Sequence, residues 1–176
     1  MQWKHKTSRT PKKFRVEKSA AKVMATVFWD GKGLLLLEFT PQKTTITGQT
    51  YANTITALRG TIKEKRRGKL SADVLLLHDN APVHMSAKSH AAIRQCGSQQ
   101  LNHPPYSPDL APSDYFLFQV MKKFFQGKRF SSDEEVKEAV TTLFEEQSKD
   151  FFSRGIKSLQ QKWAKCIELL GDDIEK

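Results

Sequence analysis

The sequence predicts an α/β domain whose C-terminal half is mostly helical. In the first half, apolar runs of strand length flank an Asp-Gly turn and recur just before an aspartate. In the second half, apolar residues recur every three or four positions, the period of amphipathic helices. A hairpin, a helix, a buried strand and then helices is an order typical of a layered domain. The 176 residues fit one domain, or one domain with a tail.

The first half contains the strands. Residues 22–29 and 34–39 are rich in β-forming residues, and the Asp-Gly-Lys-Gly sequence between them predicts a hairpin. A helix is expected over about 49–65, although Gly60 weakens its second half. Residues 73–78 are centred on Val-Leu-Leu-Leu, which predicts a short strand buried on both faces. The apolar face of the helix consists of Tyr51, Ile55, Leu58 and Ile62.

The second half predicts four helices. The first covers 85–95 and is followed by a possible short strand near 99–102 and a proline-rich loop. The next begins at Ser113, a plausible N-cap, and ends at Gly127. Two more are expected over 132–147 and about 151–169. Their apolar stripes are predicted core residues: Leu117, Val120, Met121, Phe124 and Phe125; Val136, Val140, Leu143 and Phe144; Ile156, Leu159, Trp163 and Cys166.

Positive charge is concentrated at the N-terminus. The formal net charge is +10, and residues 1–22 carry eight cations against one anion. Trp3 and Phe14 are interleaved with these cations, a pattern that favours contact with a polyanion over a merely solvated arm. A second cluster spans 63–69, for which nucleic-acid contact and a solvated surface are the two interpretations. The arm residues predicted to bind DNA are Lys4, Lys6, Arg9, Lys12, Lys13 and Arg15.

Several classes of protein do not fit the sequence. Cys96 and Cys166 are the two cysteines and form no CxxC pair, so a disulfide framework is not expected. No apolar run approaches the ~20 residues that span a bilayer, so no membrane partner is expected. A glycine-rich phosphate loop and a serine-centred nucleophile elbow are missing, which argues against an NTPase or an acyl hydrolase.

Asp79 and Asp114 are the candidate functional residues. Asp79 follows the predicted buried strand, at the edge of a sheet where ligands bind. Asp114 falls in the first turn of its helix, where the dipole stabilises its ionised form. Each aspartate alone could be structural. Two carboxylates ~4 Å apart repel by about 4 kcal/mol at an effective dielectric near 20, so a fold would gather them only around a cation. Oxygen ligands suit Mg²⁺ or Mn²⁺.

Other residues near these aspartates offer alternatives. His78 and His84 could indicate zinc, but cysteine ligands and a helical histidine spacing are missing. These histidines and Asn80 could instead orient ligands or substrate. Asp109 is a rival for the role of Asp114.

The two aspartate-containing segments resemble catalytic motifs of a known family. Residues 78–84 (HDNAPVH) and 106–115 (YSPDLAPSDY) look like the second and third catalytic motifs of mariner-family transposases, of the Tc1/mariner superfamily. The 34 residues between Asp79 and Asp114 match that family's spacing, and the third-motif residue is Asp as in its active members. The resemblance covers nearly the whole chain. It includes 21–30 (AKVMATVFWD), 127–130 (GKRF), 154–156 (RGI) and 163–166 (WAKC).

This resemblance implies an RNase H-like catalytic domain over 21–176, which cleaves and joins DNA at transposon ends with two Mg²⁺ or Mn²⁺ ions. Asp79 and Asp114 would then be catalytic metal ligands, a role for which the spacing selects Asp114 over Asp109. Residues 1–20 resemble the clamp loop, which reaches across a dimer. The implied partners are DNA and a second copy of the chain, with no small-molecule cofactor, and the implied compartment is the nucleus.

The sequence departs from the family at its first catalytic motif. That motif is a Gly-Asp-Glu-Lys-Trp-like segment on the first strand, and here it would fall before Met1. Asp30 is a poor substitute, because it lies in the predicted hairpin turn. We therefore expect an incomplete domain that is prone to aggregate without its central first strand. The alternative to a transposase fragment is an inactive remnant or a co-opted DNA-binding or dimerisation module.

Overall fold

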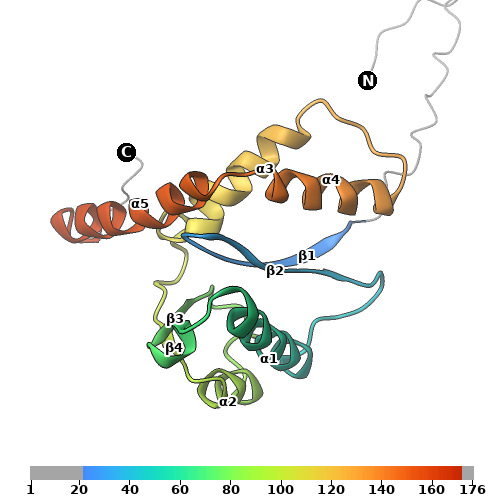
Figure 1. Cartoon of the computed structure of the whole chain (residues 1–176). Helices are drawn as coiled ribbons and strands as arrows, with labels where there is room; N and C mark the ends of the chain where they lie inside the picture. Colours follow the sequence, from blue (N-terminus) through green and yellow to red (C-terminus); the bar gives the residue numbers. More distant parts are fainter. Residues whose placement is uncertain (1–21, 172–176) are drawn as a thin grey trace, which may run out of the picture.

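The computed structural model describes residues 22–171, and Figure 1 shows their arrangement. The predicted basic arm and its DNA contacts lie outside these residues. Every predicted strand and helix is present. The strands are β1 (Met24–Asp30), β2 (Gly33–Thr40), β3 (Val74–Leu77) and β4 (Ser98–Leu101). The helices are α1 (Gly48–Lys65), α2 (Ala87–Gln95), α3 (Phe118–Phe125), α4 (Asp133–Glu145) and α5 (Lys149–Glu168). Single helical turns cover Lys69–Ser71, Pro108–Leu110 and Ser113–Leu117.

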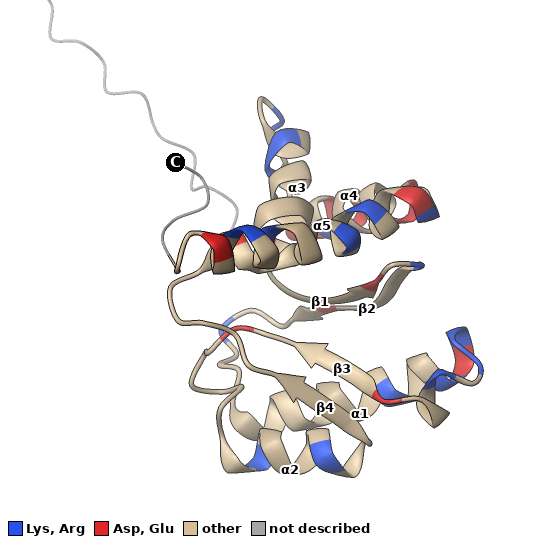
Figure 2. Ribbon diagram, turned by 90° about the vertical axis from the view of Figure 1, so that its left-hand side faces the viewer, with Lys and Arg blue, Asp and Glu red and all other residues tan. Residues whose placement is uncertain are grey.

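The strands form two separate pairs. β1 and β2 make the predicted antiparallel hairpin, whereas β3 and β4 are parallel. Within residues 22–171 no strand joins the two pairs into one sheet. Figure 2 shows the layers: α1 and α2 lie beside β3 and β4, and α3, α4 and α5 lie on the far side of the hairpin. None of the described helices is long and apolar enough to cross a membrane.

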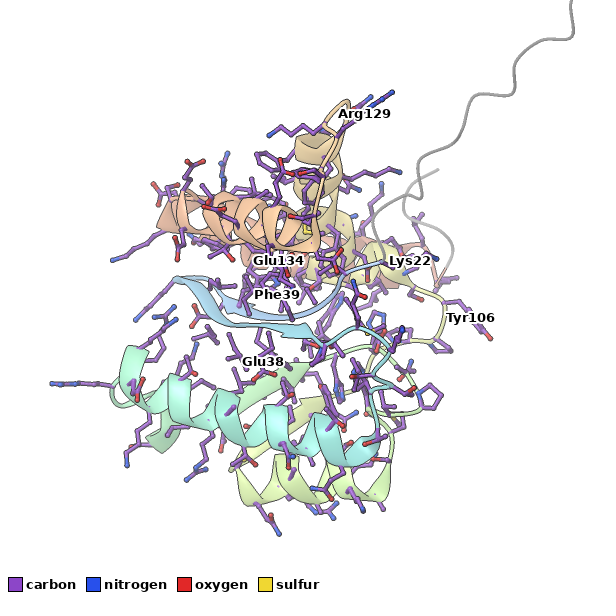
Figure 3. The ribbon with its side chains drawn as sticks, turned by 90° about the vertical axis from the view of Figure 1, so that its right-hand side faces the viewer. Lys22, Glu38, Phe39, Tyr106, Arg129 and Glu134 are labelled. Carbon is purple, nitrogen blue, oxygen red and sulfur yellow. The ribbon has the colours of Figure 1, made fainter. Side chains whose placement is uncertain are left out.

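The hairpin separates two hydrophobic cores, because alternate side chains of a strand point to opposite faces. Phe28 packs with the core of α1, α2 and β3, while its neighbours Val27 and Trp29 pack with the core of α3, α4 and α5. Figure 3 shows the same division at the end of β2. There Phe39 joins the second core, and Glu38 accepts a hydrogen bond from Thr54 Oγ1 of α1 at 2.8 Å.

A bulge changes this alternation in the middle of the hairpin. The register shifts between Phe28 and Trp29, so that Phe28 pairs with Leu36 and Trp29 pairs with Leu34. The extra residue, Leu35, is buried in the first core, and the half-buried Leu36 packs against the same core. Its carbonyl oxygen accepts a hydrogen bond from Lys65 Nζ at 3.1 Å. With strict alternation Leu34 would share the face of Leu36, so the bulge places Leu34 beside its partner Trp29, on the side of the second core.

Two predicted patterns of burial are wrong. β3 is not buried on both faces: Val74 and Leu76 are buried, but Leu75 is 57% exposed because α3, α4 and α5 cover the hairpin and not β3. The stripe of α5 is also only partly covered. Ile156 is exposed, and the fully buried positions of the helix are Phe152 and Gly155, which face the hairpin.

Candidate active site

A cavity of about 340 Å³ contains both candidate aspartates. Asp79 reaches it from the segment that follows β3, and Asp114 reaches it from the helical turn before α3. Residues of the loop after β4 form the rest of the cavity lining. The lining residues are Asp79, Asn80, His103, Pro104, Pro105, Tyr106, Ser107, Pro108 and Asp114. The two carboxylates, far apart along the chain, therefore share one site.

Asp79 is held in place through one of its carboxylate oxygens. Oδ1 lies 2.6 Å from Nδ1 of His84 and accepts a hydrogen bond from the Ala81 backbone N–H at 3.2 Å. No described residue hydrogen-bonds Oδ2. The side chain is 63% exposed, so this second oxygen is available to a ligand in the cavity.

An aromatic stack supports His84 from behind. Its ring lies 4.1 Å from the Tyr51 ring of α1 and 5.0 Å from the His78 ring, measured between centroids. Burial, and then the neighbouring His84, lower the pKa of His78 to about 4, so His78 is neutral at pH 7. Burial raises the pKa of Tyr51, so its phenol stays protonated, and the phenol oxygen hydrogen-bonds with Nδ1 of His78 at 2.7 Å.

Asp114 occupies an unusual turn. Residues Ser113–Leu117 form a π-helical turn that runs directly into α3, a feature often found at functional sites. The predicted N-cap role of Ser113 is wrong, because Ser113 lies inside this turn and its Oγ accepts a hydrogen bond from Trp29 Nε1 at 3.1 Å. On the other side of Asp114, the Tyr115 hydroxyl donates to the Gly155 carbonyl oxygen at 2.9 Å. Both neighbours of Asp114 are thus anchored to other elements.

The two carboxylates interact electrostatically. Partial burial raises the pKa of Asp114, and the negative charge of Asp79 raises it further. His103 opposes the shift. A cation in the cavity would relieve this repulsion, and carboxylate oxygens are the ligands that Mg²⁺ and Mn²⁺ prefer. The donor set fits such an ion, although no cluster of three or more His, Cys, Asp or Glu residues exists among positions 22–171.

The loop after β4 is tied to the segment after β3. Asn80 Nδ2 donates to the His103 carbonyl oxygen at 2.8 Å, which joins the two motif-bearing segments across the cavity. Sequence reasoning did not mention His103, and it quoted Tyr106 as the first residue of the motif 106–115 without giving it a role.

The rival residues lie elsewhere. Asp109 is in the turn Pro108–Leu110 and does not line the cavity. Asp30 forms a two-point ion pair with Arg66, whose Nε and Nη2 lie 2.9 and 3.0 Å from the carboxylate oxygens, and Lys69 Nζ lies at 3.2 Å. Burial alone would raise the pKa of Asp30, but these bonds and one from the Lys32 backbone lower it to about 2. Asp30 is a structural residue of the hairpin turn.

The basic cluster at 63–69 is partly used inside the fold. Arg66 and Lys69 bind Asp30, and Lys65 binds the carbonyl oxygen of the bulged Leu35. Contact with nucleic acid stays a prediction for the exposed Lys63 and Arg67. Among the described residues, His78 and His84 belong to no group of three or more His, Cys, Asp or Glu side chains that could hold a zinc ion.

Comparisons with known proteins identify relatives of this chain. A family described as "Transposase (partial DDE domain)" matches residues 1–72. The Mariner Mos1 transposase of Drosophila mauritiana is 33% identical over 163 residues, which are 92% of this chain and 47% of that protein. The human histone-lysine N-methyltransferase SETMAR is 35% identical over 151 residues, 85% of this chain and 22% of that protein. The chain thus spans half or less of these curated relatives.

Solved structures give the fold. The Mos1 transposase catalytic domain, solved with Raltegravir and Mg, matches with a TM-score of 0.82 at 32% identity, over 86% of this chain and 77% of that chain. A pre-cleavage Mos1 transpososome matches with a TM-score of 0.85 at 29% identity, over 99% of this chain and 52% of that chain. The predicted RNase H-like fold is confirmed. The chain belongs to the mariner family of DNA transposases and corresponds to their catalytic domain.

Proposed function

We propose that this chain carries the metal-dependent DNA cleavage and strand-transfer site of a mariner-type transposase, with Asp79 and Asp114 as ligands of Mg²⁺ or Mn²⁺. One observation supports this most directly. The two carboxylates line one cavity, and the charge of one raises the pKa of the other. Repulsion between two such carboxylates lowers the stability of the fold. A cation that binds between them relieves the repulsion, and this relief strengthens its binding.

Each residue of the site would have its own role in holding the metal ions. Asp79 offers Oδ2 to the ion while His84 and the Ala81 N–H hold Oδ1. Asp114 supplies the second carboxylate from a turn anchored on both sides. When bound, two divalent ions activate the attacking water or 3′-hydroxyl and stabilise the leaving oxygen of the phosphodiester.

The proposed partners are DNA and a second copy of the chain, in the nucleus. Related Mos1 structures include a paired-end complex with the left transposon end and a strand transfer complex. The net charge of +10 supports a polyanionic partner.

A second function is favoured by one observation. Residues 22–171 provide two candidate carboxylates and no third metal-binding group beside them. A chain in this form would bind DNA through its basic residues without cleaving it, as an inactive remnant or a co-opted DNA-binding or dimerisation module.

The test separates metal binding from cleavage. Free Mn²⁺ is titrated by electron paramagnetic resonance against the 176-residue chain and its Asp79→Asn, Asp114→Asn and doubly substituted variants. Asp109→Asn is the matched control, because Asp109 lies close to Asp114 in sequence but outside the cavity. We expect the site variants to lose Mn²⁺ affinity and the control to keep it. If the double variant binds Mn²⁺ like the unmodified chain, the proposed ligands are wrong.

Nicking of supercoiled plasmid DNA by the same proteins then decides between the two functions. Mn²⁺-dependent nicking that disappears in Asp79→Asn and Asp114→Asn supports the cleavage site. Mn²⁺ binding and salt-sensitive DNA binding without nicking support the DNA-binding module.

A further inference from the structure

Tyr106 presents its ring to solvent at the rim of the cavity. Its relative exposure is 103%, as high as that of a residue in an extended chain. Figure 3 shows the side chain pointing away from the body of the protein. Within the described part of the chain, no residue makes a hydrogen bond or ring contact with it. Packing within the described fold does not account for this ring.

The backbone of Tyr106 is strained as well. Its φ of 56° lies in the left-handed region, which a bulky residue adopts rarely and at a cost. Glycine or asparagine would occupy this position more easily. Folding alone therefore favours a different residue here. Backbone outliers of this kind cluster at active sites and ligand-binding sites, where the strained conformation is part of the function.

The surrounding loop restrains the backbone at Tyr106. Pro104 and Pro105 precede it and restrict the backbone. Ser107 Oγ donates to the Pro105 carbonyl oxygen at 3.1 Å, and the Asn80 side chain holds the carbonyl of His103 at 2.8 Å. The loop therefore restrains the backbone that carries the ring at the rim of the cavity.

The composition of the cavity restricts the ligand. Tyr106 lines the same cavity as Asp79 and Asp114, and no Lys or Arg of the described chain is among its lining residues. The two carboxylates would repel a phosphate unless a cation lay between them. What the loop itself offers is an exposed aromatic face beside prolines, and aromatic faces stack on unpaired bases. Bases inside a duplex are already stacked and are not available to such a ring.

We propose that Tyr106 is a stacking platform for an unpaired DNA base, either single-stranded or extrahelical, next to the phosphodiester at the carboxylate pair. This inference rests on the proposed function, since that function places a DNA backbone at Asp79 and Asp114. Tyr106 thereby positions the strand, and the carboxylates hold the ions.

The test uses the full 176-residue chain and a short oligonucleotide that contains one 2-aminopurine, both single-stranded and annealed into a duplex. The fluorescence of 2-aminopurine falls when an aromatic ring stacks on it, and anisotropy gives the dissociation constant in Mg²⁺ buffer. Tyr106→Ala and Tyr106→Gly remove the ring, and Tyr106→Phe and Tyr106→Trp keep one. Phe118→Ala is the matched control, because Phe118 is another exposed aromatic residue (39%) that does not line the cavity.

We expect Tyr106→Ala and Tyr106→Gly to lose the fluorescence change and to bind single strands roughly tenfold more weakly or worse. Tyr106→Phe, Tyr106→Trp and Phe118→Ala should keep both, and duplex affinity should be equal in all variants. Since glycine relieves the strain at this φ, Tyr106→Gly should unfold at no lower a temperature than the unmodified chain. Loss of binding in that variant is then not a loss of folding.

Equal single-strand affinity in Tyr106→Ala and the unmodified chain overturns the inference and leaves the metal site standing. The inference also fails if Tyr106→Ala changes only the sedimentation of the chain, because the ring then contacts a second copy. A different outcome is that Mn²⁺ binding is unaffected in the double aspartate variant, while Tyr106→Ala no longer binds single-stranded DNA. The proposed ligands then fail, and the stacking role remains.

Discussion

The indole Nε1 of Trp29 donates a hydrogen bond to Oγ of Ser113 at 3.1 Å, across 84 positions of sequence. Trp29 belongs to β1, and Ser113 directly precedes Asp114. The Trp29 ring also packs against Phe116 and Phe152, with centroids 6.3 and 5.9 Å away. The hairpin therefore fixes the turn that carries the second carboxylate.

Ser113→Ala tests this link. The substitution leaves the indole N–H without its partner, so we expect the free energy of unfolding to fall by about 1–2 kcal/mol. Mn²⁺ affinity should fall too, because Asp114 loses a restraint. Urea unfolding and Mn²⁺ titration measure the two effects. Ser71→Ala, at an exposed serine outside the cavity, is the control and should change neither.

His84 is expected to orient Asp79 for the metal. His84→Ala removes the hydrogen bond to Oδ1 and should weaken Mn²⁺ binding by about tenfold, a common effect for residues that hold a metal ligand. His84→Asn should restore part of the affinity, because its side-chain amide can donate to the same oxygen. His90→Ala on α2 is the control. Mn²⁺ affinity that is the same in His84→Ala as in the unmodified chain would contradict the positioning role.

Asp30 should make the protein sensitive to acid. Its pKa is about 2 in the folded state, below the usual 3.8, so its stabilising contribution is complete above about pH 4 and disappears as the pH falls toward about 2. The shift corresponds to about 2 kcal/mol at neutral pH. Asp30→Asn should be less stable than the unmodified chain at pH 7, and the difference should vanish near pH 2.

Urea unfolding between pH 2 and pH 7 measures this difference. Asp73→Asn, at an exposed aspartate, is the control and should follow the unmodified chain throughout. A constant gap between Asp30→Asn and the unmodified chain at every pH would show that the Arg66 pair does not depend on the charge of Asp30.

Two glycines should respond to alanine in opposite ways. A Cβ at Gly155 would lie 2.5 Å from Phe116 Cδ1 and 2.8 Å from Trp29 Cη2, so Gly155→Ala should lower the free energy of unfolding by about 1–3 kcal/mol. Gly60 lies inside α1 with no atom within 4 Å of such a Cβ, so Gly60→Ala should raise it by about 0.5–1 kcal/mol. Thermal or urea unfolding gives both values. A tolerated Gly155→Ala would mean that the two rings can move apart.

The sequence by itself determined the elements and the candidate acids. The Asp-Gly turn, the apolar runs and the helical periods predicted β1, β2, β3 and the helices, because they reflect turn preference and the spacing of residues that share one face. For β4, whose sequence is Ser-Gln-Gln-Leu, the sequence indicated a possible strand. The motif around Asp79 and the one around Asp114 identified the family, since their residue types and spacing are specific. The structure places both aspartates on one cavity.

Only the tertiary structure decided which side chains are covered and which elements cover them. The bulge at Leu35, the hydrogen bond that makes Ser113 an acceptor and not a cap, and the open face of Leu75 depend on elements far away in sequence. A periodic pattern shows that a face is apolar, but not which element covers it. The positive φ of Tyr106 is decided in the same way, by a proline-rich loop anchored across the cavity. Such long-range contacts override local preference because packing and hydrogen bonding outweigh a cost of about 1–2 kcal/mol at one residue.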